Sequence, residues 1–89
     1  MEFLLEPDRI AAAEGGRLLA WVTFPDRGGG IVEVDHTFVD PALRGRGVAA
    51  QLMERLAGEL SRSGRRARLT CPYAKKWWAD HPEYAGLLA

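Results

Sequence analysis

A strand-like run, a turn rich in arginine and glycine, and a helix-like run follow one another directly in the middle of the chain. Residues 31–39 read IVEVDHTFV, residues 44–47 read RGRG, and residues 48–60 read VAAQLMERLAGEL. Alternating β-branched and aromatic residues predict a strand, whereas apolar residues three and four apart predict one face of a helix. This junction therefore predicts a fold in which a sheet and a helix share one core.

Four further segments complete the predicted order of elements. The pair Gly15-Gly16 between two short apolar runs indicates a hairpin that joins strands near residues 9–13 and 17–24. The long helix is expected over residues 48–63, with Gly64 at its C-terminal end. Residues 67–71 are expected to form a short strand, and a second helix is expected to follow and to stop before Pro82. The predicted order is β-β-β-α-β-α, an α+β fold with a mixed sheet.

The third strand, residues 31–39, is predicted to be continuous. Even-numbered residues from Val32 to Phe38 would then share one face, and odd-numbered residues from Ile31 to Thr37 would share the other. The second face is the more acidic of the two, because it carries Glu33 and Asp35.

Length and cysteine content limit what the chain can be. With 89 residues, it is expected to form a single domain over residues 1–89. Its one cysteine, Cys71, allows neither an intramolecular disulfide nor a metal site of several cysteines, so no metal is expected. The cysteine usage fits a reducing cytoplasm, and no apolar run approaches the length of a membrane span. We therefore expect a cytoplasmic protein with no membrane partner.

Charge is unevenly distributed along a chain whose formal net charge is zero. Residues 1–43 carry eight acids and three bases, whereas residues 44–89 carry nine bases and four acids. A chain that is neutral overall but basic in its second half favours a localised anionic ligand over a long polyanion. A small nucleic-acid binder that uses residues 62–68, RSGRRAR, is therefore the weakest of the functions considered, and no nucleic-acid partner is expected.

The RGRG turn has the composition of a phosphate site. A helix N-terminus presents backbone N–H groups without intrahelical partners and carries a partial positive charge. Glycine lets a backbone approach a phosphate closely, and Arg44 and Arg46 can donate forked hydrogen bonds to phosphate oxygens. The simpler interpretation is a solvated turn that only needs glycine. The residues alone leave both interpretations open.

Two common phosphate motifs do not explain this turn. The P-loop pattern GxxxxGK[ST] is absent. GRGVAA does match G-x-G-x-x-A of dinucleotide-binding folds, but that fingerprint requires an acid about 20 residues further on. No Asp or Glu lies between Glu59 and Asp80.

A third pattern fits. Residues 44–49, RGRGVA, match [QR]-x-x-G-x-[GA], and the chain resembles the GNAT superfamily of acyl-CoA-dependent N-acyltransferases. More narrowly, HTFVDPALRGRGVAAQL and CPYAKKWWADHPEYAGLL resemble the minimal single-domain GNAT-related family. The resemblance implies acetyl-CoA as ligand, with pantetheine between two strands that splay apart. It also implies the residues that bind it: Phe38, Val39, Arg44, Gly45, Arg46, Gly47, Val48 and Ala49.

The resemblance leaves the group that serves the departing thiolate open. Larger members often carry N-x-x-A-x-x-x-Y after the second splayed strand, with the tyrosine as the acid. Aligned on Ala74, this chain has Cys71 at the asparagine position and Trp78 at the tyrosine position, and tryptophan is not an acid. Cys71 and Tyr73 are the nearest substitutes. Cys71 is interpreted either as a reactive thiol near the positive end of the long helix or as a small buried apolar residue.

Three residues of the third strand are candidates for the base that removes a proton from the amine. His36 can exchange a proton near neutral pH, and its strand lies beside the expected cofactor gap. Glu33 and Asp35 are rivals, although exposed acids on strands usually only interact with solvent. The leading hypothesis is an N-acetyltransferase that moves an acetyl group from acetyl-CoA to an amine or peptide. The alternative is a non-catalytic CoA-binding or protein-interaction module of the same fold.

Overall fold

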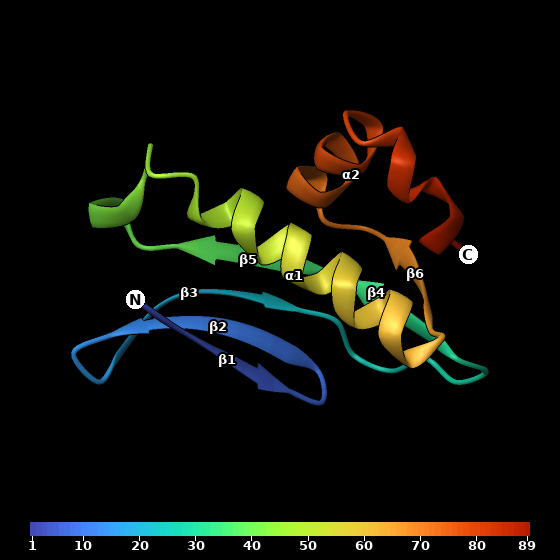
Figure 1. Cartoon of the computed structure of the whole chain (residues 1–89), viewed down its shortest axis with the longest axis horizontal. Helices are drawn as coiled ribbons and strands as arrows, with labels where there is room; N and C mark the ends of the chain where they lie inside the picture. The colour runs from blue at the N-terminus through green and yellow to red at the C-terminus, as the bar shows by residue number, and fades with distance from the viewer.

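The computed structural model describes the whole chain, Met1 to Ala89, and its strands form two sheets (Figure 1). One sheet is antiparallel with the order β1-β2-β3-β5, and the other is the parallel pair β4-β6. The predicted α+β class with both kinds of strand pairing is confirmed. The elements are β1 (Glu2–Glu6), β2 (Arg9–Glu14), β3 (Arg17–Thr23), β4 (Ile31–Val34), β5 (His36–Val39), the short 3-10 helix η1 (Pro41–Leu43), α1 (Val48–Ser63), β6 (Arg66–Leu69), α2 (Pro72–Ala79) and the 3-10 helix η2 (Pro82–Leu87).

The predicted hairpin and the predicted long helix are both present. Gly15 and Gly16 close the β2-β3 hairpin with positive φ angles of 59° and 81°, which glycine adopts with little strain. α1 has the predicted bounds and ends at Gly64, which is in the left-handed conformation. The strand β6 ends two residues earlier than predicted, so that Cys71 precedes α2 rather than closing the strand.

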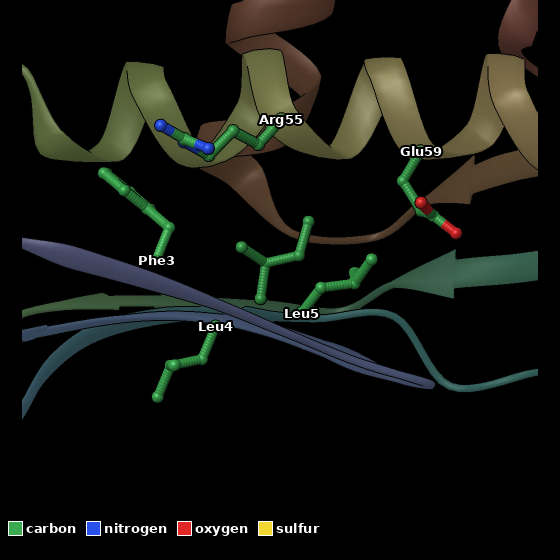
Figure 2. Close-up of a pocket in the computed structure, with 6 residues that line it drawn as sticks. Phe3, Leu4, Leu5, Arg55 and Glu59 are labelled. Carbon is green, nitrogen blue, oxygen red and sulfur yellow. The ribbon is translucent and has the colours of Figure 1, made fainter.

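β1 was not predicted from the sequence. It pairs with β2 along its whole length and forms one edge of the antiparallel sheet. Phe3 and Leu5 point toward α1, whereas Leu4 points away from it (Figure 2). The guanidinium of Arg55 on α1 lies 3.8 Å from the centre of the Phe3 ring, so a cation–π contact covers this edge.

The prediction of one continuous strand over residues 31–39 is wrong. The strand breaks at Asp35, and β4 and β5 pair with different neighbours. His36 is the register partner of Thr23, and the Asp35 N–H also donates to the Thr23 carbonyl at 3.3 Å. Asp35 and His36 thus both lie opposite Thr23, and this arrangement is a β-bulge.

The bulge reverses the alternation of side chains along this segment. Val32 and Val34 are fully buried beneath the helices. After the bulge, Thr37 lies opposite the buried Val22, and Val39 lies opposite the buried Ala20. His36 and Phe38 therefore lie on the opposite face from Val32 and Val34, contrary to the expectation that all four share a face.

The core lies between the strands and the two helices. Val32, Val34, Val22 and most of the apolar side of α1 belong to the same buried cluster as Ala74, Trp77 and Trp78 of α2. We call this side of the antiparallel sheet the helix face. The other side, on which Leu4, Ala11, Trp21 and Phe38 lie in register across four strands, we call the outer face. Both α-helices lie on the helix face (Figure 1).

Candidate functional site

The turn between β5 and α1 leaves a row of backbone donors without acceptors. Asp40 accepts a hydrogen bond from the Ala42 N–H at 2.9 Å and so fixes the start of η1. Arg44 and Arg46 donate their N–H groups to carbonyls of η1. No group of the chain accepts a hydrogen bond from the N–H groups of the following residues: Gly45, Gly47, Val48, Ala49 and Ala50.

The start of α1 favours an anion. Its N-cap residue is Gly47, which has φ 73° and no side chain to cap the helix, and the first turn contains no acid. The free N–H groups and the helix dipole therefore act without local neutralisation. Arg44 and Arg46 are exposed beside this turn, and neither forms an ion pair.

A concavity of about 240 Å³ adjoins this turn. Most of the residues expected to bind the cofactor line it, but Arg46 and Phe38 do not. Tyr73 of α2 also lines it. The lining residues are Val39, Leu43, Arg44, Gly45, Gly47, Val48, Ala49, Ala50 and Tyr73.

The two sheets separate at Val34. Its carbonyl accepts hydrogen bonds from the N–H groups of both Thr70 and Cys71, each at 3.0 Å. Beyond this point β5 follows β3, while the chain after Cys71 turns into α2. We call this point of separation the vertex.

β5 has a free edge on the side of the separation. The Asp40 N–H donates to the Leu19 carbonyl at 2.7 Å, on the side of β3. Because backbone groups alternate along a strand, those of Thr37 and Val39 point to the free edge. An extended ligand could add to this edge by hydrogen bonding, as peptides do at open strands.

Cys71 lies on the buried side of the vertex. It is 4% exposed and belongs to the core cluster. Its Sγ lies 3.4 Å from Oγ1 of Thr37. Cys71 is the N-cap residue of α2, so the helix terminus next to it belongs to α2. The sequence-based expectation that this terminus belongs to the long helix α1 is wrong.

Tyr73 carries an accessible phenol that lines the concavity. It is 38% exposed, and partial burial raises the pKa of its phenol above the ordinary value. The phenol therefore stays protonated through the neutral and mildly alkaline range. Trp78 at the usual tyrosine position is buried, and its indole N–H donates to the Tyr84 carbonyl at 3.1 Å.

The candidate bases differ in how they are held. Glu33 accepts hydrogen bonds from the Thr70 hydroxyl at 2.8 Å and from the Arg27 guanidinium at 3.0 Å. These two contacts, in that order, lower the pKa of Glu33, so its carboxylate is a weak base. Asp35 and His36 are exposed and lie at the bulge. Asp35 accepts a hydrogen bond from the Thr23 hydroxyl at 2.5 Å.

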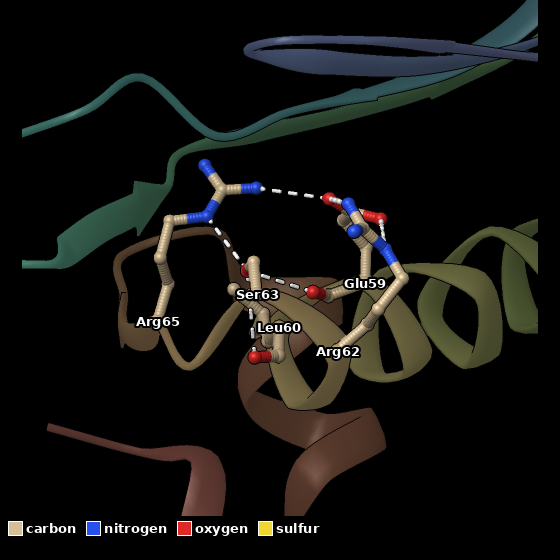
Figure 3. A network of polar contacts seen from close by, with 5 residues as sticks. All are labelled: Glu59, Leu60, Arg62, Ser63 and Arg65. Atoms are coloured by element: carbon tan, nitrogen blue, oxygen red, sulfur yellow. Dashed lines mark hydrogen bonds and ion pairs between the residues drawn. The ribbon is translucent and has the colours of Figure 1, made fainter.

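The basic segment after α1 is occupied by local contacts (Figure 3). Arg62 and Arg65 both pair with Glu59, and Arg65 also donates to the Ser63 hydroxyl at 2.9 Å. The hydrogen bond from Arg62 is the main cause that lowers the pKa of Glu59. Arg62 and Arg65 therefore make local contacts at the C-terminal end of α1, where positive charge is favoured by the helix dipole.

Three residues of the site were not predicted from the sequence. Thr37 reaches Cys71, Thr70 reaches Glu33, and Trp21 stacks on Phe38 at 4.6 Å between ring centres. Each contact joins segments that are distant in the sequence and depends on how the strands pair, for which the sequence carries no direct signal. The structure brings no group of three His, Cys, Asp or Glu side chains together that could hold a metal ion. None of its helices has the length and apolar character needed to cross a membrane.

The splayed strands, the glycine turn and the anion-favouring start of α1 define a fold of the GNAT type. Residues 9–87 match the family model of the GCN5-related N-acetyl-transferases, and the chain belongs to that family. Comparison with curated protein sequences gave no match.

Solved structures show the same fold. A GCN5-like protein from Staphylococcus aureus superposes with a TM-score of 0.79 at 19% identity, covering 99% of this chain and 87% of that one. Ribosomal-protein-alanine N-acetyltransferase from Brucella melitensis biovar Abortus 2308 gives 0.62 at 24% identity, covering 81% of this chain and 59% of its own. The ribosomal-protein-S18-alanine N-acetyltransferase from Escherichia coli gives 0.66 at 18% identity, with 88% and 50% covered. At these identities the likeness concerns the fold alone.

Proposed function

We propose that the chain binds acetyl-CoA and transfers its acetyl group to a primary amine. The observation that carries this proposal is the set of unpartnered N–H groups at the start of α1, beside the concavity. Five donors that no group of the chain satisfies, next to two exposed arginines, are suited to a pyrophosphate. Membership of the GCN5-related family supports acetyl-CoA as the ligand that contains this pyrophosphate.

The pantetheine arm would follow the free edge of β5 toward the vertex. Val39 and Thr37 offer backbone groups along that edge, and Val39 also lines the concavity. An arm held there by backbone hydrogen bonds would bring the thioester close to the point at which Val34 binds Thr70 and Cys71. This space lies beyond the bulge, after which β5 pairs with β3 and has no partner on the side of β6.

The reaction needs an acid for the thiolate and a base for the amine. The amine nitrogen bonds to the thioester carbonyl carbon and the carbon–sulfur bond breaks. A primary ammonium loses two of its three protons: one is matched by the proton that the thiolate takes up, and the other is released through the base. An ammonium substrate thus gives an amide, a free thiol and one released proton. Tyr73 is our candidate for the acid, because it is accessible and holds its proton. Asp35 and His36 are the candidates for the base, since Glu33 is already engaged by Thr70 and Arg27.

Cys71 is the second candidate for the group that serves the thiolate. Its position next to the vertex supports it, whereas its 4% exposure counts against it. The non-catalytic alternative rests on one observation: the usual tyrosine position holds Trp78, whose N–H is already bonded within the chain. Turnover of acetyl-CoA with a panel of amines separates an enzyme from a binding module.

Calorimetry of CoA and acetyl-CoA binding tests the proposal. Arg44→Glu and Arg46→Glu should each weaken binding by at least about 1 kcal/mol, or about fivefold, because a charge-assisted contact becomes a repulsion. Arg66→Glu is the control, since it makes the same charge change at an exposed site on β6. Equal losses for all three variants would indicate a diffuse field and refute a local phosphate site.

A further inference from the structure

The outer face carries a pair of aromatic side chains that no helix covers. Trp21 and Phe38 are register partners on β3 and β5, and their rings stack with centres 4.6 Å apart and planes 29° apart. The same row continues through Ala11 to Leu4, which points away from α1 (Figure 2). Both aromatic residues remain partly exposed, so they offer a flat apolar platform.

A carboxylate without a cationic partner lies beside this platform. Thr23 follows Trp21 at a spacing of two on β3, so its hydroxyl is on the outer face, and it donates to Asp35 at 2.5 Å. The carboxylate of Asp35 therefore also lies on the outer face. None of the ion pairs of the structure involves Asp35, whereas the nearby Glu33 pairs with Arg27. His36 lies on the same face, opposite Thr23.

The vertex is covered on its helix face. On the helix face, Cys71 and Thr37 are in contact at 3.4 Å, and Val34 is fully buried beneath the helices. Because Asp35 and His36 next to it are exposed, we expect a second substrate to approach a thioester at the vertex from the outer face. Asp35 and His36 stand at the bulge where that approach ends.

Resting on the proposed function, we infer that the outer face around Trp21, Phe38 and Asp35 binds the acceptor as a primary alkylammonium group. Asp35 supplies the counter-charge, and the aromatic pair packs against the alkyl stem and attracts the cation. This chemistry fits both a lysine side chain and a free alkylamine. It disfavours an anionic acceptor, which would meet the negative charge of Asp35.

Binding can be measured without turnover. We would titrate the protein, saturated with CoA, with a short lysine peptide blocked at both ends, and follow the indole N–H signal of Trp21 by NMR. A second titration uses the same peptide with norleucine in place of lysine, which keeps the stem and removes the charge. The lysine peptide should shift the Trp21 signal at concentrations at which the norleucine peptide does not. Equal shifts, or none, would overturn the inference.

Variants separate the acceptor site from the cofactor site. Asp35→Asn, which keeps the size of the side chain, should raise the apparent KM for the lysine peptide at least fivefold and leave the Kd for CoA within twofold. Phe38→Leu should raise the same KM, and it serves as a second probe if a change at Trp21 disturbs folding. Glu14→Gln is the matched control, because it removes one exposed acid at the far end of the β2-β3 hairpin.

The outcomes distinguish two kinds of failure. If the parent protein does not bind CoA, the proposed function fails, and the inference fails with it. If CoA binds and Asp35→Asn leaves the KM for the lysine peptide unchanged, only the acceptor site is refuted. Parallel assays with n-butylamine show which source of the ammonium group is preferred.

Discussion

Gly47 and Gly64 stand at opposite ends of α1 in nearly the same conformation and form a matched pair for mutation. Gly47 has φ 73° and ψ 16°, and Gly64 has φ 72° and ψ 15°. An added Cβ would find no other atom within 4 Å at either position, so alanine would be strained by the backbone and not by a clash. Only Gly47 adjoins the proposed phosphate site.

The cost in stability should be the same for both variants. A left-handed alanine costs about 1–2 kcal/mol, and a stiffer unfolded chain offsets about 0.4–1 kcal/mol of that. We expect each variant to lower the free energy of unfolding by about 1 kcal/mol, or to lower Tm by about 4–8 °C for a chain of this size. Urea unfolding followed by tryptophan fluorescence measures it.

The effect on CoA binding should differ. Relief of the strain at residue 47 would move the N–H groups of Val48 and Ala49, so the affinity of Gly47→Ala for CoA should fall at least about fivefold, which is about 1 kcal/mol. Gly64→Ala should bind CoA within twofold of the parent, because it lies about 24 Å away along a helix of this length. Equal losses of affinity in the two variants would mean that CoA binding follows global stability. No loss of affinity in either variant would mean that the pyrophosphate does not bind at this turn.

Two further predictions concern protons. Tyr73→Phe should lower kcat at least tenfold with little change in KM, whereas Cys71→Ser should stay within threefold of the parent; the reverse pattern in steady-state assays would assign the acid role to Cys71. Thr70→Val removes the main contact that lowers the pKa of Glu33, so that pKa should rise toward its ordinary value, as carboxyl NMR titration can show. A carboxyl whose pKa is lower in the folded than in the unfolded protein stabilises the fold at pH values above its unfolded pKa, and this contribution is lost as the pH falls through the folded pKa. Thr70→Val should therefore lose less stability than the parent when the pH is lowered below about 4.5. The same acid-induced loss in both proteins would contradict the role given to the Thr70 hydrogen bond.

The sequence predicted those elements whose residues decide their own structure. The spacing of Leu52, Met53, Leu56 and Leu60 marked the buried face of α1, and all four are fully buried. Gly15-Gly16 marked the hairpin, because its turn needs positive φ angles. Local chemistry was sufficient in both cases.

The parts that failed depend on distant partners. Nothing within IVEVDHTFV indicates that Asp35 is an extra residue, because the bulge arises where one segment must pair with β3 on one side and β6 on the other. β1 was missed because its run Phe3-Leu4-Leu5 does not alternate, although its side chains do. The exposed position of Tyr73 in the concavity and the burial of Cys71 follow from how α2 docks, which no short motif encodes.

The parallel pairing of β4 with β6 also sets the order in which the chain can assemble. β1, β2 and β3 are joined by tight turns, so their pairing closes only short loops and can form early. β4 must wait for β6, because Ile31 pairs with Arg66 across the whole of η1 and α1. The vertex at Val34 is then completed late in folding, and we expect the amides of Thr70 and Cys71 to exchange with solvent before those of the β2-β3 hairpin. A ligand that bridges the vertex would then stabilise a part of the fold that opens more readily than the hairpin, and should slow the exchange of the Thr70 and Cys71 amides.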